Sequence, residues 1–484
     1  MSAAAPNTRL APSLPYRRIA LVLSGGGALG AYEIGVLRVL EAVRLVPSLV
    51  VGVSIGAVNA VAWLAAGYDA GPIERVWRSA RGETLGVQWV SLVLRVTGAF
   101  LVVMATFQAV LRLVSSSAFF VQWVWHRPGI EIGQDSVMLD VLVWVMLALI
   151  GALMAIFARR VAGGLDQRPV SVDPARARLW LGRAMWIAVG FYLLMWLMPV
   201  PWPQTSSASL VILLAVAWAA TTRGRLGRWL RGLALGLMPE TRGRALWSGQ
   251  ARQRILERLV AEGDGSRLCG PGTALVVTAL ALDRGTVTHF ASWPETDARF
   301  ETHLGAELDE VLHVRDADEM IRAAVASSAI PGLFQPETIR GRDFIDAGGF
   351  SNQPLHVAIA DGADALLVVL VSPSGLPDEA PLDDVVSLGN RLLELANWRD
   401  LQTELRNMPP EWSREGVPAR VCVIEPPSRL PAAPLVFDPE QAGQLIALGE
   451  RDAWAALERS GWLERAPERE RAAAGLRPGA VPGA

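Results

Sequence analysis

Four long apolar runs lie together in the middle of this 484-residue chain. They cover residues 87–111, 137–158, 184–200 and 208–220. Crossing the hydrocarbon core of a bilayer takes about 20 apolar residues, with a range of about 17 to 25. The first three runs satisfy that length and the fourth is marginal. The pattern predicts an all-α transmembrane insert of about four segments, with buried helices of a large core as the alternative.

Charge is distributed unevenly around these runs. Residues 84–236 hold 13 arginines and five acidic residues, a balance of +8, and the rest of the chain holds 32 arginines against 42 acidic residues, a balance of −10. The connections between the runs are alternately rich and poor in arginine, and short cytoplasmic loops are the ones that keep an excess of Lys and Arg. Both ends of the insert are therefore predicted to face the cytoplasm. This indicates an integral protein of a bacterial inner (cytoplasmic) membrane, with the rest of the chain on the cytoplasmic side.

Outside the insert, short apolar runs alternate with helical patterns. Strands are predicted at residues 18–23, 47–53, 274–283, 286–290, 343–345 and 365–371, and helices at residues 31–45, 57–66, 320–328 and 439–459. Such alternation is typical of a mostly parallel sheet covered by helices. The expected fold class is α/β, a mostly parallel sheet flanked by helices and interrupted by the all-α insert.

Five segments follow from these patterns. They are an N-terminal tail (1–16), the first half of the α/β domain (17–83), the insert (84–236), the second half of the domain (237–463) and a tail expected to be disordered (464–484). The N-terminal tail lacks the apolar stretch of a signal peptide. The two cysteines, Cys269 and Cys422, are far apart in sequence, which argues against a disulfide framework and a Cys-rich zinc site and indicates a reducing compartment.

A glycine-rich loop follows the first predicted strand and reads Gly-Gly-Gly-Ala-Leu-Gly over residues 25–30. Glycines let the backbone approach a ligand closely, and free N–H groups at a helix N-terminus attract negative charge. Gly25, Gly27 and Gly30 also match the dinucleotide template G-x-G-x-x-G, which requires an acidic residue at the end of the next strand. That strand ends instead in Ser54, so a nucleotide site is disfavoured.

Ser54 lies in a G-x-S-x-G sequence between a predicted strand and a predicted helix, with Gly52 and Gly56 on either side. A serine on such a tight turn leaves no room for side chains two positions away, and its hydroxyl projects above the sheet edge. The pattern predicts a nucleophile elbow with Ser54 as the nucleophile.

A serine nucleophile needs a base. The chain has five histidines, His126, His289, His303, His313 and His356, and none is an obvious partner. His356 has the chain order usual for α/β-hydrolases, but its helical position after Pro354 favours a core or solvent-facing histidine. Asp346 is the better candidate, since it ends a short strand before small residues. Partial burial can raise the pKa of such a carboxylate toward the working pH.

These features together resemble the patatin-like phospholipase family. The resemblance rests on the glycine-rich loop, the G-x-S-x-G sequence and the segments 326–334 and 345–354, and it extends over about residues 18–81 and 238–452. Two positions depart from the family pattern. Ala347 separates Asp346 from Gly348, where the family usually has glycine directly after the aspartate, and Leu29 stands where Arg or Lys is frequent.

The resemblance implies a Ser-Asp dyad that hydrolyses acyl esters of lipids through an acyl-enzyme, with no metal and no cofactor. It implies Ser54 as nucleophile and Asp346 as base. It further implies an oxyanion hole formed by backbone N–H groups of the glycine-rich loop, namely Gly25, Gly26, Gly27 and Gly30.

The predicted function is a membrane-embedded serine lipid acyl hydrolase of the phospholipase A or lysophospholipase type. Its expected partners are the bilayer and a phospholipid or lysophospholipid substrate, with no nucleic acid. In the sequence, Ser54 and Asp346 lie on opposite sides of the insert, so an even number of spans is required for them to meet. The segments 184–200 and 208–220 either both span or form a shallow re-entrant hairpin about Pro199–Pro203. The alternative is a non-catalytic lipid-binding or membrane scaffold protein with the same fold. The sequence does not indicate the oligomeric state.

Overall fold

The computed structural model describes residues 14–82, 244–294, 309–376, 385–413 and 418–463, with residues 97–99, 101–103, 105–106, 109–110, 142 and 144–154 of the insert. The chain divides into two compact units. One is formed by Met1–Val87 and Trp247–Ala484, and the other by Gln88–Leu246.

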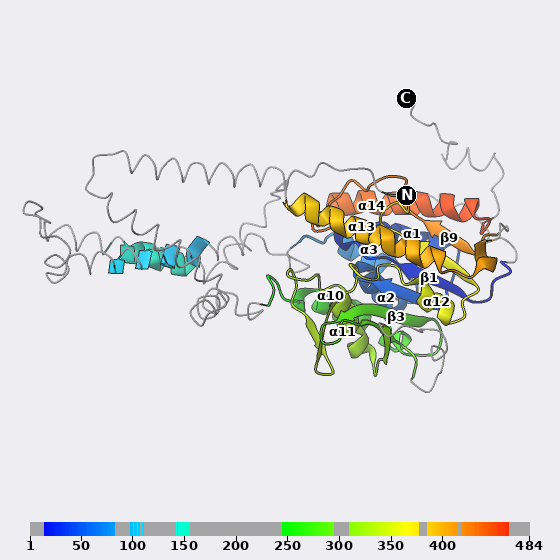
Figure 1. The fold of residues 1–484 in the computed structure, drawn as a ribbon, viewed down its shortest axis with the longest axis horizontal. Helices are drawn as coiled ribbons and strands as arrows, with labels where there is room; N and C mark the ends of the chain where they lie inside the picture. Colours follow the sequence, from blue (N-terminus) through cyan, green and yellow to red (C-terminus); the bar gives the residue numbers. More distant parts are fainter. Residues whose placement is uncertain are drawn as a thin grey trace, which may run out of the picture. The chain divides into compact units, whose positions relative to one another are not determined.

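Nine strands form one sheet within the described part of the first unit (Figure 1). They are β1 (Ile19–Leu23), β2 (Leu49–Val53), β3 (Ala274–Ala281), β4 (Val287–Ala291), β5 (Asp309–His313), β6 (Glu337–Ile339), β7 (Arg342–Asp346), β8 (Ala365–Val369) and β9 (Val421–Ile424). Their order is β5-β4-β3-β2-β1-β8-β9, and β7 pairs with both β3 and β6. Among these pairings, five are parallel and three antiparallel, so the predicted mostly parallel α/β sheet is confirmed.

Helices flank the sheet. They are α1 (Ala31–Ala42), α2 (Ile55–Ala65), α3 (Gly71–Trp77), α10 (Gln250–Glu262), α11 (Ala317–Ser327), α12 (Leu355–Ala360), α13 (Val385–Arg406) and α14 (Pro439–Arg459), with 3-10 turns at Gly27–Gly30, Gly265–Leu268 and Pro410–Ser413. Two of them begin at aspartate N-caps, which satisfy backbone N–H groups that the helix leaves free. Asp316 accepts from Glu319 N, and Asp438 accepts from the first turn of α14.

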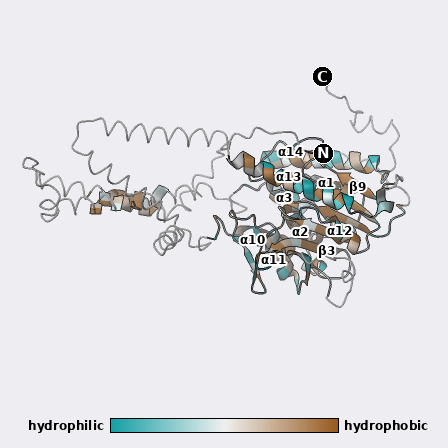
Figure 2. Ribbon diagram, viewed as in Figure 1, coloured by the Kyte–Doolittle hydropathy of each residue, from teal (hydrophilic) through white to brown (hydrophobic). Residues whose placement is uncertain are grey.

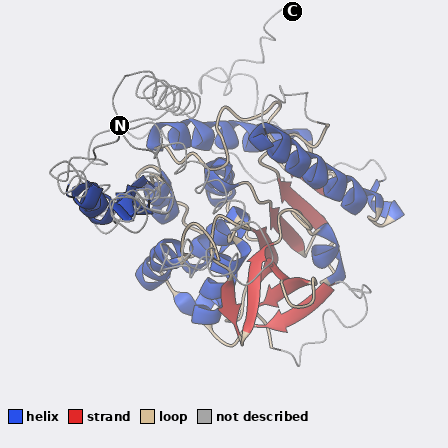
Figure 3. Ribbon diagram, turned by 60° about the vertical axis from the view of Figure 1, so that its left-hand side comes forward, coloured by secondary structure: helices blue, strands red, loops and turns tan. Residues whose placement is uncertain are grey.

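Each face of the sheet packs against its own set of helices (Figure 3). Successive side chains of a strand point to opposite faces. Leu21 and Val50 accordingly join a cluster with α1, α2, α10, α11 and α14, whereas Val22 and Val51 join a cluster with α12 and with Leu401 of α13. Burial on both faces explains why these strands are continuous apolar runs, which Figure 2 shows in brown.

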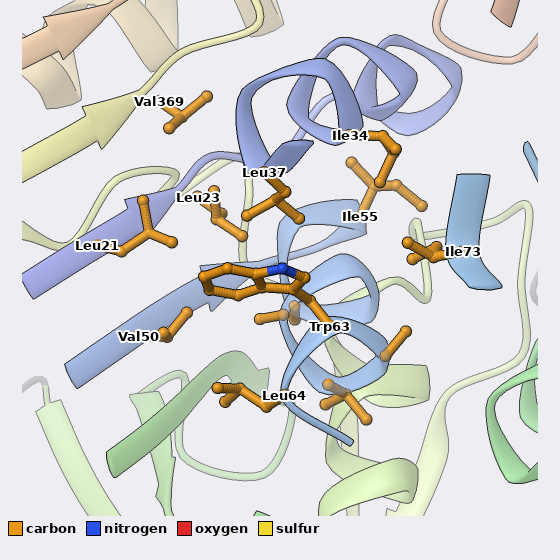
Figure 4. Close-up of a cluster of buried hydrophobic side chains, with 14 of the residues drawn as sticks. Leu21, Leu23, Ile34, Leu37, Val50, Ile55, Trp63, Leu64, Ile73 and Val369 are labelled. Atoms are coloured by element: carbon orange, nitrogen blue, oxygen red, sulfur yellow. The ribbon is translucent and has the colours of Figure 1, made fainter. Parts of the chain in front are cut away.

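Trp63 of α2 is fully buried near the middle of the larger cluster (Figure 4). Side chains from β1, β2 and α1 surround it, including Leu21, Val50 and Leu37. Its ring also meets Tyr68 edge to face, with centroids 5.2 Å apart. This packing fixes α2, the helix that begins directly after Ser54, against the sheet.

Apart from residues 244–246, the described residues of the second unit are helical. Their buried members are small, namely Gly98, Ala99, Ala105, Ala109 and Gly151. A Cβ on Gly151 would lie 2.5 Å from Gly98 O, so the two helical stretches are in backbone contact there. The exposed members include eight large apolar side chains, Val103, Val110, Leu142, Val145, Met146, Leu149, Ile150 and Leu153.

The structure does not support the transmembrane insert directly. Within the described residues, no helix has both the length and the apolar character needed to cross a membrane. The predicted segments 184–200 and 208–220, and parts of 87–111 and 137–158, lie outside the described residues.

Candidate active site

Ser54 occupies the turn between β2 and α2. Its φ of 54° and ψ of −121° lie in a region that residues with a side chain rarely adopt. A Cβ on Gly52 would lie 2.6 Å from Ala57 Cα, and one on Gly56 would lie 2.5 Å from Leu23 O. Close backbone packing on both sides of the turn therefore requires the two glycines and holds Ser54 in its strained conformation.

The register of the sheet brings Asp346 to Ser54. Strand β3 pairs with β2 as far as Thr278, which lies opposite Val53. From the next residue onward β3 pairs with β7 instead, and Asp346 lies opposite Ala279. Strand β7 thus takes the place beside β3 where β2 ends and the chain turns at Ser54.

The Ser54 hydroxyl donates a hydrogen bond of 2.5 Å to Asp346 Oδ2. The other carboxylate oxygen, Oδ1, accepts a 2.8 Å bond from Gly348 N. Ser54 is only 5% exposed and Asp346 only 7%. The bond from Gly348 N to Oδ1 therefore orients the carboxylate, and Oδ2 accepts the bond from the serine hydroxyl. This is the arrangement of a base beside a nucleophile.

Burial raises the pKa of Asp346 to about 6. The hydrogen bonds from Ser54 and Gly348 and the positive charge of Arg252 act in the opposite direction, toward a lower pKa. The carboxylate is consequently ionised at neutral pH yet more basic than an exposed aspartate. Both properties favour removal of the serine proton.

Arg252 of α10 is a buried cation whose charge reaches this carboxylate. It is 7% exposed, and its guanidinium carbon lies 3.6 Å from the centroid of the Phe334 ring. Its three side-chain nitrogens have no hydrogen-bond acceptor among the described residues. Burial lowers its pKa to about 10, so it remains charged at neutral pH. The sequence gives one indication that Arg252 is buried. It lies four residues before Leu256 and seven before Leu259, and so on the same face of the helix as these apolar residues.

The first glycine of the glycine-rich loop is bound to Asn352. Gly25 N donates a 3.0 Å bond to Asn352 Oδ1, and Asn352 Nδ2 donates a longer bond of 3.4 Å to Gly25 O. A Cβ on Gly25 would lie 2.9 Å from Ser54 Cβ, so the loop lies directly against the nucleophile. The Gly25 N–H is therefore engaged and not free to bind a substrate oxygen, contrary to the expectation for Gly25.

The remaining glycines of the loop differ in role. No acceptor for the N–H groups of Gly26 and Gly27 is found among the described residues. Gly27 has a φ of 59°, and a Cβ there would collide with the carbonyl oxygen of Pro434. Gly30 instead packs against Ile55, whose side chain would lie 2.6 Å from an added Cβ. Among the four glycines, Gly26 and Gly27 are thus the ones whose N–H groups have no acceptor there, and Gly30 is a packing position, contrary to the expectation for Gly30.

Further polar side chains support the site, although the nucleophile and base motifs of the sequence do not indicate them. Ser54 N donates to Ser327 Oγ at 2.7 Å, and Ser327 Oγ donates to Thr278 O at 2.6 Å. Asn352 N donates to Asp400 Oδ2 at 2.9 Å. The one available signal was that Asn352 lies in the segment 345–354, which carries part of the family resemblance.

The histidines lie elsewhere. Among the described ones, His289, His313 and His356, none is hydrogen-bonded to Ser54 or Asp346. His356 is half-buried between Asp309 and Glu404, consistent with the expectation that it is not the catalytic base. His126 and His303 lie outside the described residues.

A serine on a strained strand-to-helix turn, hydrogen-bonded to a buried aspartate on a mostly parallel α/β sheet, is the architecture of a serine hydrolase. A family model described as patatin-like phospholipase matches residues 21–359. The chain therefore belongs to the patatin-like phospholipase family, and is a lipid acyl hydrolase by membership.

Comparison with curated proteins gives no match. One similar solved structure is VipD from Legionella pneumophila, with 13% identity, coverage of 95% of this chain and 72% of that chain, and a TM-score of 0.32. A similarity this low carries no argument about this chain.

Proposed function

We propose that the chain is a membrane-embedded serine lipid acyl hydrolase of the phospholipase A or lysophospholipase type. In this proposal it cleaves fatty-acyl ester bonds of phospholipids or lysophospholipids with a Ser54–Asp346 dyad. The observation that carries the proposal is the buried 2.5 Å hydrogen bond between Ser54 Oγ and Asp346 Oδ2 in a chain of this family.

In the first half of the reaction, Ser54 Oγ attacks the ester carbonyl carbon and its proton passes to Asp346 Oδ2. The N–H groups of Gly26 and Gly27 stabilise the negative charge that develops on the carbonyl oxygen, and loss of one such donor typically lowers the rate about 10²- to 10³-fold. The ester C–O bond then breaks, and the leaving alcohol oxygen takes the proton from Asp346. The product is acyl-Ser54.

In the second half, a water molecule attacks the acyl-enzyme. Asp346 accepts a proton from this water as it did from the serine, since microscopic reversibility lets one group act as base and then as acid. Breakage of the acyl–Ser54 bond releases the fatty acid, and the proton on Asp346 returns to Ser54 Oγ. Water is the one reactant needed besides this chain and the ester substrate.

The second unit supports the membrane location. In water-soluble proteins the large apolar side chains are buried, whereas membrane helices contact one another through small residues and expose large apolar side chains to lipid. The described residues follow the membrane pattern, with Gly98 and Gly151 in contact and Leu149, Ile150 and Leu153 exposed. The alternating arginine content of the connections favours a cytoplasmic catalytic unit.

Labelling with a fluorophosphonate probe tests the nucleophile. The wild type should be labelled, and Ser54→Ala should lose labelling together with hydrolysis of phospholipid in mixed micelles. Ser328→Ala is the matched control, since this nearby serine is also buried but donates to Val325 O of α11, the helix that it caps. Equal labelling of the wild type and Ser54→Ala would refute the proposal. Absence of turnover on any acyl ester by a folded wild type would favour the scaffold alternative.

A further inference from the structure

A second cluster of reactive side chains lies away from the dyad. His289 of β4, Asp309 of β5 and His356 of α12 each present one possible metal-ligand atom, and these three atoms lie within 4.8 Å of one another. In the parallel pairing of β4 and β5, Asp309 lies opposite Val287, two residues before His289. The side chains of Asp309 and His289 therefore point to the same face of the sheet. That face is the one that α12 covers.

His289 is held with one ring nitrogen free. It is 0% exposed, and its Nδ1 is hydrogen-bonded to Thr278 Oγ1 at 3.0 Å. Its Nε2 is buried and has no hydrogen-bond partner among the described residues. A buried polar atom without a partner is costly, and native structures usually provide one. When Nδ1 donates the bond to Thr278, Nε2 carries the lone pair that a metal ligand needs.

His356 is oriented in a similar way. Its Nδ1 is 2.5 Å from Glu404 Oε1, and its Nε2 is 3.3 Å from Asp309 Oδ2. A carboxylate on one ring nitrogen that turns the other toward a metal is the usual outer support of a metal-binding histidine. Glu404 is well placed for this support, since only 12% of its side chain is exposed.

The spacing is close to that of a bound ion. Zinc–ligand bonds of 2.0–2.1 Å in a tetrahedral arrangement place the donor atoms about 3.4 Å apart. The pair formed by His356 Nε2 and Asp309 Oδ2 already has this separation. The His289 ligand atom lies within 4.8 Å of the other two, so an adjustment of at most about 1.4 Å brings it to the same spacing.

We propose that His289, Asp309 and His356 form a binding site for a divalent transition metal, with Zn²⁺ as the ion that best fits two imidazoles and one carboxylate. Glu404 and Thr278 act as positioning residues that orient the two imidazole rings. The ion takes the place of a proton on His356 Nε2, which is released, and a water completes the tetrahedron. The ion would connect the β4–β5 edge of the sheet to α12, the helix that follows the Asn352 segment.

Zinc titration of the purified full-length chain in detergent, without a histidine tag and after treatment with a chelator, tests the site. After the titration and removal of unbound ion, the wild type should hold one Zn²⁺ per chain, measured by elemental analysis and calorimetry. His289→Gln and Asp309→Asn should weaken binding at least about 100-fold, and Glu404→Gln about 10- to 100-fold. His313→Gln is the matched control and should bind Zn²⁺ as the wild type does. His313 lies on β5, as Asp309 does, but its Nδ1 is hydrogen-bonded to Trp293 O.

X-ray absorption at the zinc edge keeps the test decisive even if a variant fails to fold. The wild type should show nitrogen and oxygen ligands at about 2.0 Å, with two imidazoles. A sulfur shell, which would place the ion on Cys269 or Cys422, would overturn the proposal. Failure of the folded wild type to retain Zn²⁺, unchanged binding by His289→Gln, or equal affinity for Mg²⁺ would overturn it as well. These readouts do not depend on hydrolase activity.

Discussion

Asp346 is a single residue at which reactivity and stability oppose each other. Burial raises the pKa of Asp346 to about 6 from 3.8 in the unfolded chain. A carboxyl with a raised folded pKa contributes its full stability only below the unfolded pKa, and that contribution is lost as the pH rises through the folded pKa. Above pH 6 the ionised carboxylate therefore destabilises the fold by on the order of 2–3 kcal/mol.

Asp346→Asn should consequently abolish turnover and yet raise the melting temperature by several degrees at pH 7.5, because the neutral amide has no ion to desolvate. The gain should shrink as the pH falls from about 6 to 4, where the wild-type carboxyl also becomes neutral. Thermal unfolding across this pH range measures the effect. Ser54→Ala is the control, since it is inactive but keeps the titrating aspartate. A gain independent of pH would contradict this account of Asp346.

Arg252 provides a second test at the same scale. Its buried positive charge lowers the pKa of Asp346, so Arg252→Met should raise that pKa. Because the base must be ionised to act, the acid limb of the kcat/KM profile should move to higher pH, with activity largely recovered above it. Arg252→Lys keeps the charge and should leave the limb near its wild-type position. A uniform loss at every pH would instead indicate that Arg252 acts only through packing.

At the scale of elements, the sequence predicts those whose signal is local. The strands at residues 18–23, 47–53 and 365–371 are confirmed because burial on both faces makes them apolar throughout, and α14 is confirmed from Pro439 to Arg459. Strand β5 was missed because its sequence, Asp-Glu-Val-Leu-His, belongs to a half-buried edge strand. Helices α10 and α13 were missed as well.

The pairing between distant segments could not be predicted from the sequence. Ser54 and Asp346 were identified from their motifs, but the register of β3 that joins them depends on β7 running antiparallel beside it. The bond between Gly25 and Asn352 spans 327 positions and likewise has no local signal. Motifs therefore predicted which residues carry the chemistry. Only the structure shows that the Gly25 N–H is bonded to Asn352 and so is not available as an oxyanion donor.

The contact between α1 and α14 gives a prediction for elements. Gly35 and Gly449 each face the backbone of the other helix, and a Cβ at Gly449 would collide with the carbonyl oxygen of Tyr32. Gly449→Ala should therefore force the helices apart and destabilise the fold by about 1–3 kcal/mol. On the same helix, Gly443→Ala would meet only the mobile end of Arg78 at 3.0 Å and should be neutral or slightly stabilising. Thermal unfolding of the two variants compares them, and equal melting temperatures would contradict the close contact.

At the scale of the whole molecule, two units of opposite character share one chain. The catalytic unit is assembled from Met1–Val87 and Trp247–Ala484, and the insert between them carries the basic, apolar sequence. A soluble helix pair would bury its large apolar side chains, yet Leu149 is 59% exposed and Leu153 53%. In the proposed membrane location, lipid would cover this surface, since hydrocarbon solvates apolar side chains without cost.

Leu149→Glu combined with Leu153→Glu tests this assignment. A charged side chain at the centre of a membrane helix opposes insertion by about 3 kcal/mol, so the double variant should lose most of its resistance to alkaline carbonate extraction from membranes, whereas the wild type stays in the pellet. Val46→Glu is the matched control, because Val46 is an equally exposed apolar residue, 56%, on the catalytic unit. It should fractionate as the wild type does. If the double variant stayed in the pellet as firmly as this control, the surface that carries Leu149 and Leu153 would face water or protein rather than lipid.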